Sequence, residues 1–293
     1  MTAELKSDLG PQEYAAPSTL AEAAELLVGG DAIILAGGTD LMLQTGSGKI
    51  PYRRLLVNVR RIEEIRGASK DGDEIRIGAL TTMTDIQGDE LLGEMAPVLA
   101  EAANHFASSQ VRNAATIGGN ICNASPAGDS IPALLVLDAE VELTSWVGGA
   151  TSRRRVPLKN FFTGPGSTVI ESNELMTAIC FPVPEQRTVA RFLKSGPRPA
   201  LEISIVSAAM SASREGDTLF HVRLAFGAVG LTPIRATATE ALLEGKTLDA
   251  QLIEQAVETL LGEISPIDDV RATAWYRAHL ASVYLRRLLG DDD

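Results

Sequence analysis

The spacing of hydrophobic positions changes along the chain, and each change predicts a different element. Thr19 and Glu22 form a capping-box pair, and the apolar residues that follow at helical spacing predict a helix reaching Leu27. Residues 32–35 are all apolar and predict a buried strand that leads into a glycine pair. Apolar residues alternate with charged or small ones over 75–79, which predicts a half-buried strand.

The pattern shifts near residues 182–200, where prolines gather around a serine–glycine pair. Such a cluster is typical of a domain junction, and it divides the chain into predicted domains of residues 1–178 and 179–293. In the second domain, period-two alternation over 203–209 and 220–226 predicts two antiparallel strands. Two amphipathic stretches that follow predict helices beside those strands.

Two glycine pairs offer backbone amides next to short polar side chains, at residues 36–40 (AGGTD) and 116–120 (TIGGN). Glycine lets a ligand oxygen approach the backbone, and successive N–H groups in a turn form a concavity for anions. Two such turns predict loops that close on one doubly charged ligand, such as a dinucleotide pyrophosphate. The first pair lacks the G-x-G-x-x-G spacing of a Rossmann helix, so a nucleotide here needs a different fold. A plain strand-to-loop connection is the alternative interpretation.

Composition and charge exclude several classes of function. The 293 residues carry a net charge of −12, which argues against nucleic acid or an anionic membrane as partner. The cysteines, Cys122 and Cys180, are too few for an iron–sulfur cluster, which needs about four thiolates. The three histidines show no metal-ligand spacing. No apolar run of about 18 residues occurs, and the polar N-terminus lacks a signal-peptide core, so we expect a cytoplasmic protein without a membrane span.

Four further side chains have competing interpretations when judged on their own. Asp129 is either a ribose-binding carboxylate or a turn cap, and Cys122 is better explained as a small buried packing residue than as a redox thiol. Lys194, within the proline-rich junction, is by itself an ordinary exposed lysine. His105 is expected near a helix end, in a polar role rather than as a general base. No Ser/His/Asp or Cys/His constellation supports nucleophilic catalysis.

Four longer stretches together give the chain a family resemblance: 36–41 (AGGTDL), 110–129 (QVRNAATIGGNICNASPAGD), 225–246 (AFGAVGLTPIRATATEALLEGK) and 265–277 (SPIDDVRATAWYR). With these the chain resembles the flavoprotein, or medium, subunit of the molybdenum hydroxylases, which include carbon monoxide dehydrogenase and bacterial xanthine dehydrogenases. The resemblance implies an α+β fold: a two-subdomain FAD-binding region of the vanillyl-alcohol oxidase type, then a C-terminal α+β domain with a small antiparallel sheet and helices.

The resemblance also implies which residues contact FAD. They are Leu35, Ala36, Gly37, Gly38, Thr39, Asp40, Leu41, Phe106, Ala107, Ala115, Thr116, Gly119, Asn120, Cys122, Asp129 and Lys194. The segment 35–41 would line the pyrophosphate, whereas the polar residues of 116–129 would hold the pyrophosphate, ribityl and ribose groups. Phe106 and Ala107 would lie near the flavin ring or the adenine. Lys194 would lie near the isoalloxazine carbonyls, where a cation favours reduced flavin. No catalytic or metal-binding residue is implied.

In that family a large subunit carries molybdopterin and hydroxylates the substrate, and a small subunit with two [2Fe–2S] clusters relays electrons. The resemblance therefore implies that this chain binds FAD and passes those electrons to an external acceptor, within a dimer of heterotrimers. The shortage of cysteines agrees, because the clusters must then belong to another chain. Two alternatives stay open: a self-sufficient FAD oxidoreductase of the same fold, and a non-catalytic assembly module.

Overall fold

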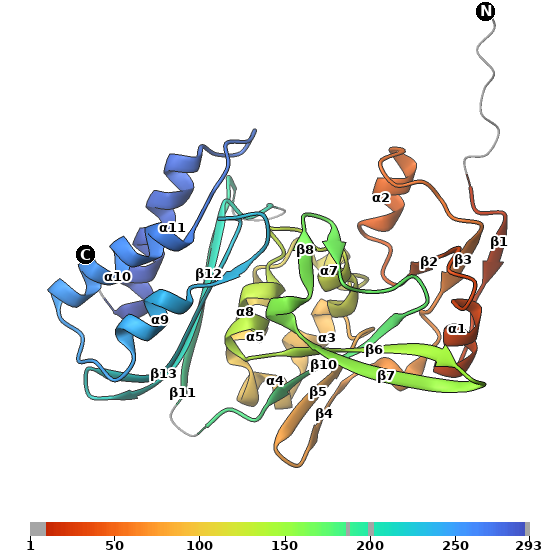
Figure 1. Cartoon of the computed structure of the whole chain (residues 1–293), viewed down its shortest axis with the longest axis horizontal. Coiled ribbons are helices and arrows are strands. Elements are labelled where there is room, and N and C mark those ends of the chain that lie inside the picture. Colours follow the sequence, from red (N-terminus) through yellow and green to blue (C-terminus); the bar gives the residue numbers. More distant parts are fainter. Residues whose placement is uncertain (1–9, 186–187, 199–201, 291–293) are drawn as a thin grey trace, which may run out of the picture.

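A computed structural model describes residues 10–185, 188–198 and 202–290 of the chain, which form three units arranged in a row (Figure 1). The N-terminal unit is a small parallel sheet of order β1-β3-β2 with two helices. Its elements are β1 (Glu13–Ala15), α1 (Leu20–Leu26), β2 (Ala32–Leu35), α2 (Leu41–Gly46) and β3 (Leu55–Asn58). The predicted capping box is confirmed, because the Thr19 hydroxyl accepts from the Glu22 N–H and the Glu22 carboxylate accepts from the Thr19 N–H.

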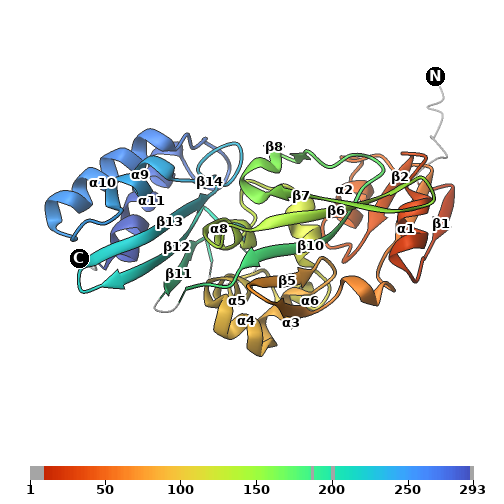
Figure 2. The same cartoon turned by 60° about the horizontal axis from the view of Figure 1, so that its bottom comes forward.

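The middle unit is a five-stranded antiparallel sheet of order β4-β5-β10-β6-β7, with helices α3 to α6 gathered along one side of it (Figure 2). Pro97 occupies the first position of α5, where its missing N–H leaves no helical hydrogen bond unmade. The helical stretch is therefore divided into α4 and α5 at this proline. The elements are η1 (Glu63–Ile65), β4 (Ala68–Asp71), β5 (Glu74–Gly78), α3 (Met83–Gly88), α4 (Glu90–Met95), α5 (Pro97–Asn104), α6 (Ser109–Arg112), α7 (Ile117–Cys122), α8 (Ser130–Val136), β6 (Glu140–Val147), β7 (Ala150–Pro157), η2 (Leu158–Asn160), β8 (Phe162–Gly164), β9 (Ser167–Thr168) and β10 (Leu175–Pro182).

The C-terminal unit is an antiparallel sheet of order β11-β12-β13-β14 that carries three helices on one face (Figure 1). The predicted hairpin is confirmed, since β12 and β13 pair and turn through residues 215–218. The elements are β11 (Thr188–Ser195), β12 (Val206–Glu215), β13 (Thr218–Gly227), β14 (Ile234–Arg235), α9 (Thr237–Leu243), α10 (Ala250–Glu263) and α11 (Ala274–Leu289). The expected α+β class with a small antiparallel sheet and helices is therefore what the structure shows.

The middle and C-terminal units share a packed boundary. Helix α5 contacts β11, and α8 contacts β12 and β13. The largest hydrophobic cluster runs from the middle unit into the C-terminal sheet through Phe192, Ala209 and Ala225. The predicted division at residue 178 falls inside strand β10. This strand stays paired with β5 as far as Pro182. The chain thus leaves the middle sheet only after that proline.

Two local predictions need correction. The second glycine pair is not a turn, because residues 117–122 form helix α7, capped by the Thr116 hydroxyl, which accepts from the Gly119 N–H at 3.1 Å. The segment around Lys194 is not an irregular junction, because it forms strand β11 along the edge of the C-terminal sheet. Within the described ranges no helix is long and apolar enough to cross a membrane. The prediction that the N-terminus lacks a signal-peptide core concerns the first nine residues, which lie outside those ranges.

Candidate functional site

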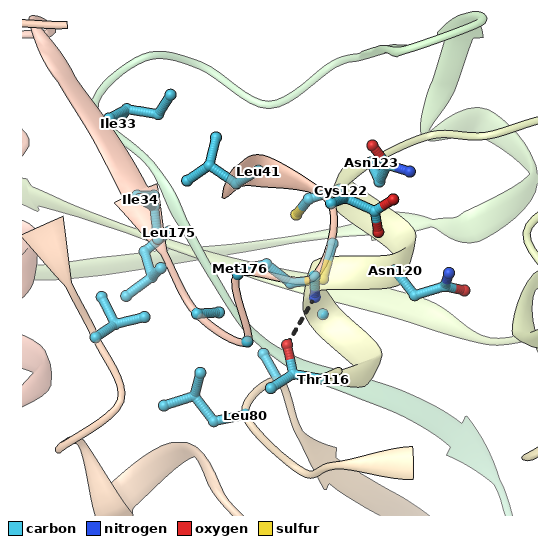
Figure 3. Close-up of a pocket in the computed structure, with 18 of the residues that line it drawn as sticks. Ile33, Ile34, Leu41, Leu80, Thr116, Asn120, Cys122, Asn123, Leu175 and Met176 are labelled. Atoms are coloured by element: carbon cyan, nitrogen blue, oxygen red, sulfur yellow. Dashed lines mark hydrogen bonds between the residues drawn. The ribbon is translucent and has the colours of Figure 1, made fainter. Parts of the chain in front are cut away.

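A cavity of about 350 Å³ opens between the N-terminal and middle units, and both glycine pairs contribute to its wall (Figure 3). Most of the residues that the sequence assigned to a cofactor meet here. They are Ala36, Gly37, Gly38, Thr39, Asp40, Leu41, Phe106, Ala115, Thr116, Gly119, Asn120 and Cys122. Strand β2 delivers the first group at its end, whereas α7 and the segment before it deliver the second. Segments about 80 residues apart in the chain thus form one site, as the two glycine pairs predict.

The first glycine pair allows these two segments to touch. A Cβ on Gly37 would lie 2.1 Å from the carbonyl oxygen of Ala114, closer than any real side-chain atom comes. Gly38 has a φ of +77°, in the left-handed region that favours glycine. The first glycine is therefore needed for contact between the loops, and the second for the turn between β2 and α2.

Polar contacts fix the second segment against its surroundings. The Gly118 N–H donates to the Ala79 carbonyl at 2.9 Å, and the Ser130 hydroxyl donates to the Asn120 side-chain oxygen at 2.7 Å. The Gln44 amide donates to the Asn123 side-chain oxygen at 2.9 Å and so joins α2 to the end of α7 across the cavity. These contacts hold the backbone of both segments in one arrangement before any ligand arrives.

Much of the cavity wall carries no sequence signal. One part is apolar, with Ile33, Ile34, Leu80, Leu175 and Met176 directed toward the space in the close-up (Figure 3). The segment 170–176, which joins β9 to β10, forms another part. This segment contains no motif, and only the pairing of β10 between β5 and β6 brings it here, whereas Ile33 and Ile34 come from the apolar run of β2.

Positive charge is sparse along the wall of the described cavity, which also carries the carboxylates of Asp40, Glu171 and Glu174. Arg53 is the one arginine or lysine in it, and its guanidinium already donates to the Gly30 carbonyl at 2.9 Å. Burial raises the pKa of Asp40, and the ammonium of Lys49 partly opposes that rise. An anion in this cavity would therefore meet mainly backbone amides, as expected for an acidic protein.

Four assigned residues are not part of this wall: Leu35, Ala107, Asp129 and Lys194. Lys194 is not an exposed lysine, because its side chain is only 1% accessible. Its ammonium donates to the Asp129 carboxylate at 2.7 Å, the His105 carbonyl at 3.0 Å and the Glu202 carbonyl at 3.3 Å, which uses all three of its donors. The structure thus places Lys194 in a buried ion pair between the middle and C-terminal units.

Asp129 does not act as a turn cap, and each of its carboxylate oxygens accepts a hydrogen bond from the C-terminal unit. It precedes α8 but makes no capping bond with its side chain. The Ser204 hydroxyl donates to its second oxygen at 2.5 Å, opposite the contact with Lys194. Burial raises the pKa of Asp129, and the adjacent ammonium offsets part of that rise. Each carboxylate oxygen keeps a second acceptor site, and contact between Asp129 and a cofactor stays a prediction.

Cys122 is another correction, because it is exposed at the cavity rather than buried as a packing residue. Cys180, by contrast, is 1% accessible. Among the described residues no group of three or more His, Cys, Asp or Glu side chains is arranged to hold a metal ion. His105, considered from the sequence as a general base, lies away from the cavity wall, and so does Tyr276 of α11.

Comparison with known proteins identifies the class to which this fold and cavity belong. Residues 8–184 match the FAD binding domain in molybdopterin dehydrogenase, and residues 191–291 match the CO dehydrogenase flavoprotein C-terminal domain. Together the two domains define a flavoprotein with a non-Rossmann FAD-binding region. The chain belongs to the molybdenum hydroxylase family, as one of its FAD-binding oxidoreductase subunits.

Relatives match over nearly the whole chain. The xanthine dehydrogenase FAD-binding subunit of Escherichia coli O157:H7 is 34% identical over 282 residues, covering 95% of this chain and 94% of its own. The carbon monoxide dehydrogenase medium chain of Hydrogenophaga pseudoflava is 33% identical over 279 residues, covering 94% and 95%.

Solved structures show the same fold. A carbon monoxide dehydrogenase structure from H. pseudoflava has a TM-score of 0.89 at 32% identity, covering 94% of this chain and 95% of that one. Quinoline 2-oxidoreductase from Pseudomonas putida 86 has a TM-score of 0.86 at 26% identity, covering 94% and 95%.

The residues present fit FAD. The wall combines a glycine cradle that a Cβ would fill, exposed backbone beside hydroxyl groups, and an apolar side. These are the features required by a pyrophosphate that joins two aromatic ring systems.

Proposed function

We propose that this chain is the electron-transfer subunit of a heterotrimeric molybdenum hydroxylase. In this proposal it receives electrons from the [2Fe–2S] clusters of a small partner subunit and passes them to an external acceptor. A large partner subunit would carry molybdopterin and the organic substrate. The xanthine dehydrogenase FAD-binding subunit and the carbon monoxide dehydrogenase medium chain among the relatives support the proposal, because each match extends over both domains and most of the relative's length.

One observation carries the proposal: Gly37 packs against Ala114, so that both glycine segments face the same cavity. Bound FAD supplies the redox chemistry, and the chain's own residues bind it, orient it and limit its contact with water. The segments 36–41 and 115–122 would hold the pyrophosphate and ribityl groups, with Phe106 at one part of the wall. Asp129 and Lys194 would act from behind the site rather than by contact.

No histidine lines the described cavity wall, and of its carboxylates Glu174 is already paired with Arg154. The proposed division of labour needs no acid–base group here, since the organic substrate reacts on another subunit, whereas a self-sufficient oxidoreductase would need one placed to move a substrate proton. We further propose a cytoplasmic location and a dimer of heterotrimers, as in the family that the sequence resembles.

The test has two stages. The full-length chain is first titrated with FAD, and uptake is followed by the quenching of flavin fluorescence. The chain is then expressed with and without its predicted partner subunits, and reduction of the bound flavin by the organic substrate is recorded in a stopped-flow spectrometer. We expect FAD uptake by the chain alone and flavin reduction only in the complex. Flavin reduction by substrate in the isolated chain would instead identify a self-sufficient enzyme.

A further inference from the structure

Three consecutive backbone carbonyls behind the cavity wall are held by two buried or partly buried cations. The carbonyl of His105 accepts from Lys194 at 3.0 Å. The guanidinium of Arg112 donates to the carbonyl of Phe106 at 2.7 Å and to that of Ala107 at 3.4 Å. These hydrogen bonds from Lys194 and Arg112 form a clamp on the backbone. Since Phe106 lines the cavity, the clamp fixes the position of one part of the wall.

The clamped segment has an uncommon backbone conformation. Ala107 has a φ of +39°, in the left-handed region that costs a residue with a Cβ about 1 kcal/mol or more. The segment lies between the end of α5 and the start of α6, so neither helix imposes this geometry. A conformation of this kind persists only where surrounding contacts enforce it, and the contacts from Arg112 and Lys194 are of that kind.

Each cation is itself held in place. The Nε of Arg112 donates to the Gln87 side-chain oxygen at 3.2 Å, and the Gln87 amide donates to the Asn104 side chain at 2.7 Å. Lys194 is fixed by Asp129, which it contacts at 2.7 Å. The clamp therefore has a second set of supports from α3, α5 and the start of α8.

Cations bound to carbonyls also affect the amides on the other side of each peptide bond. The Phe106 carbonyl belongs to the same peptide as the Ala107 N–H, and the Ala107 carbonyl to the same peptide as the Ser108 N–H. Within the described part of the chain neither N–H has an acceptor. Withdrawal of electron density by Arg112 makes both better donors, because hydrogen-bonded peptide groups polarise one another.

We propose that Arg112 is a positioning residue for the flavin, assisted by Lys194: by holding the segment 105–107 it fixes Phe106 at the cavity wall and strengthens the peptide donors next to that wall. This inference rests on the proposed function, because it assumes that FAD occupies the cavity. Arg112 makes no contact with the cofactor in this role and acts through the carbonyls of Phe106 and Ala107.

The test compares Arg112→Gln and Arg112→Lys with wild type, in the full-length chain. Arg191→Gln is the matched control, because Arg191 also donates to a backbone carbonyl, that of Arg287 at 3.2 Å, but stands in β11 away from the cavity. Three quantities are measured: the Kd for FAD, the midpoint potential of the bound flavin, and the melting temperature without FAD.

We expect Arg112→Gln to raise the Kd for FAD by about tenfold or more, because a charge-assisted hydrogen bond is lost. We also expect it to lower the midpoint potential of the bound flavin. Arg112→Lys keeps one charged donor and is expected between wild type and the glutamine variant, and Arg191→Gln should match wild type. A folded Arg112→Gln or Arg112→Lys protein with wild-type Kd and midpoint potential would overturn the inference, even if its melting temperature fell. The lysine variant carries the test should the glutamine variant not fold.

The two proposals fail in different ways. If wild type took up no FAD, the proposed function would be overturned and this inference with it. If wild type bound FAD and the Arg112 variants did so equally well, only the inference would be lost.

Discussion

Replacing Gly37 by alanine tests whether the contact between the two glycine segments builds the site. The new Cβ would lie 2.1 Å from the Ala114 carbonyl oxygen, 2.9 Å from its carbonyl carbon and 3.1 Å from the Cα of Ala115. All three are backbone atoms, so no side chain can rotate away. The loops must separate by roughly 1 Å to restore an ordinary contact, which is the overpacking that costs about 1–3 kcal/mol.

That separation affects FAD binding as well as the fold. Residues 36–41 and 115–122 would no longer face one pyrophosphate together, and the loss of one charge-assisted bond costs about 1.5–3 kcal/mol. We therefore expect Gly37→Ala to raise the Kd for FAD by about 10- to 100-fold, and to lower the free energy of unfolding by about 1–3 kcal/mol.

Gly46→Ala is the matched control. Gly46 belongs to α2 just after the first glycine segment, and a Cβ there would meet nothing within 4 Å. Alanine is the better helix former by about 1 kcal/mol, so this variant should be as stable as wild type or more so, with an unchanged Kd. Fluorescence titration gives both Kd values, and urea unfolding gives the stabilities. Wild-type FAD affinity in Gly37→Ala would refute the idea that close contact between the loops shapes the site.

Two further predictions concern other parts of the chain. Burial alone would raise the pKa of Asp269, but bonds from the Arg271 and Ala272 amides and from the Arg277 guanidinium lower it to about 2. The resulting stabilisation, about 1–2 kcal/mol after allowance for its exposure, is present above pH 4 and is lost as the pH falls from about 4 toward 2. Asp269→Asn should therefore flatten the fall of unfolding free energy over that range in urea melts, and an unaltered slope would disprove the assignment. Cys122 is exposed at the cavity and Cys180 is buried, so a maleimide should label Cys122 alone in the folded protein. Desolvation raises the pKa of the Cys122 thiol to about 12, so we expect slow labelling near neutral pH, and slower labelling with FAD present. Labelling at equal rates with and without FAD would count against FAD at this wall.

Short-range signals explain the elements that the sequence predicts well. The Thr19–Glu22 capping box marks the first helix because its bonds span only three residues. Pro97 marks the break between α4 and α5 because its effect on the backbone is local. Strand β13 is readable because Val222 and Leu224 are buried while Arg223 between them is not, which makes apolar residues recur at every second position, whereas β12 is buried on both faces over 206–212.

The misassigned parts depend on contacts far apart in the chain. Gly118 and Gly119 are poor helix formers, yet α7 forms because Thr116 caps it and the Ala79 carbonyl accepts from Gly118. Strand β11 has its apolar residues in adjacent pairs, at 189–190 and 192–193, rather than in alternation, and prolines on both sides of it suggest a loop. The burial of Lys194 depends on Asp129, 65 positions earlier, and sequence spacing cannot foretell that pairing.

The same pairing has a thermodynamic consequence for the cofactor. Lys194 belongs to the C-terminal unit, whereas its acceptors His105 and Asp129 belong to the middle unit, and the Ala228 N–H donates across the same boundary to the Pro126 carbonyl at 2.8 Å. His105 is followed directly by Phe106, at the wall of the cavity. Docking of the C-terminal unit and order at that wall therefore depend on the same bonds. A ligand that binds only the ordered wall must then favour the docked arrangement, and docking must strengthen ligand binding by the same free energy, because linkage is reciprocal.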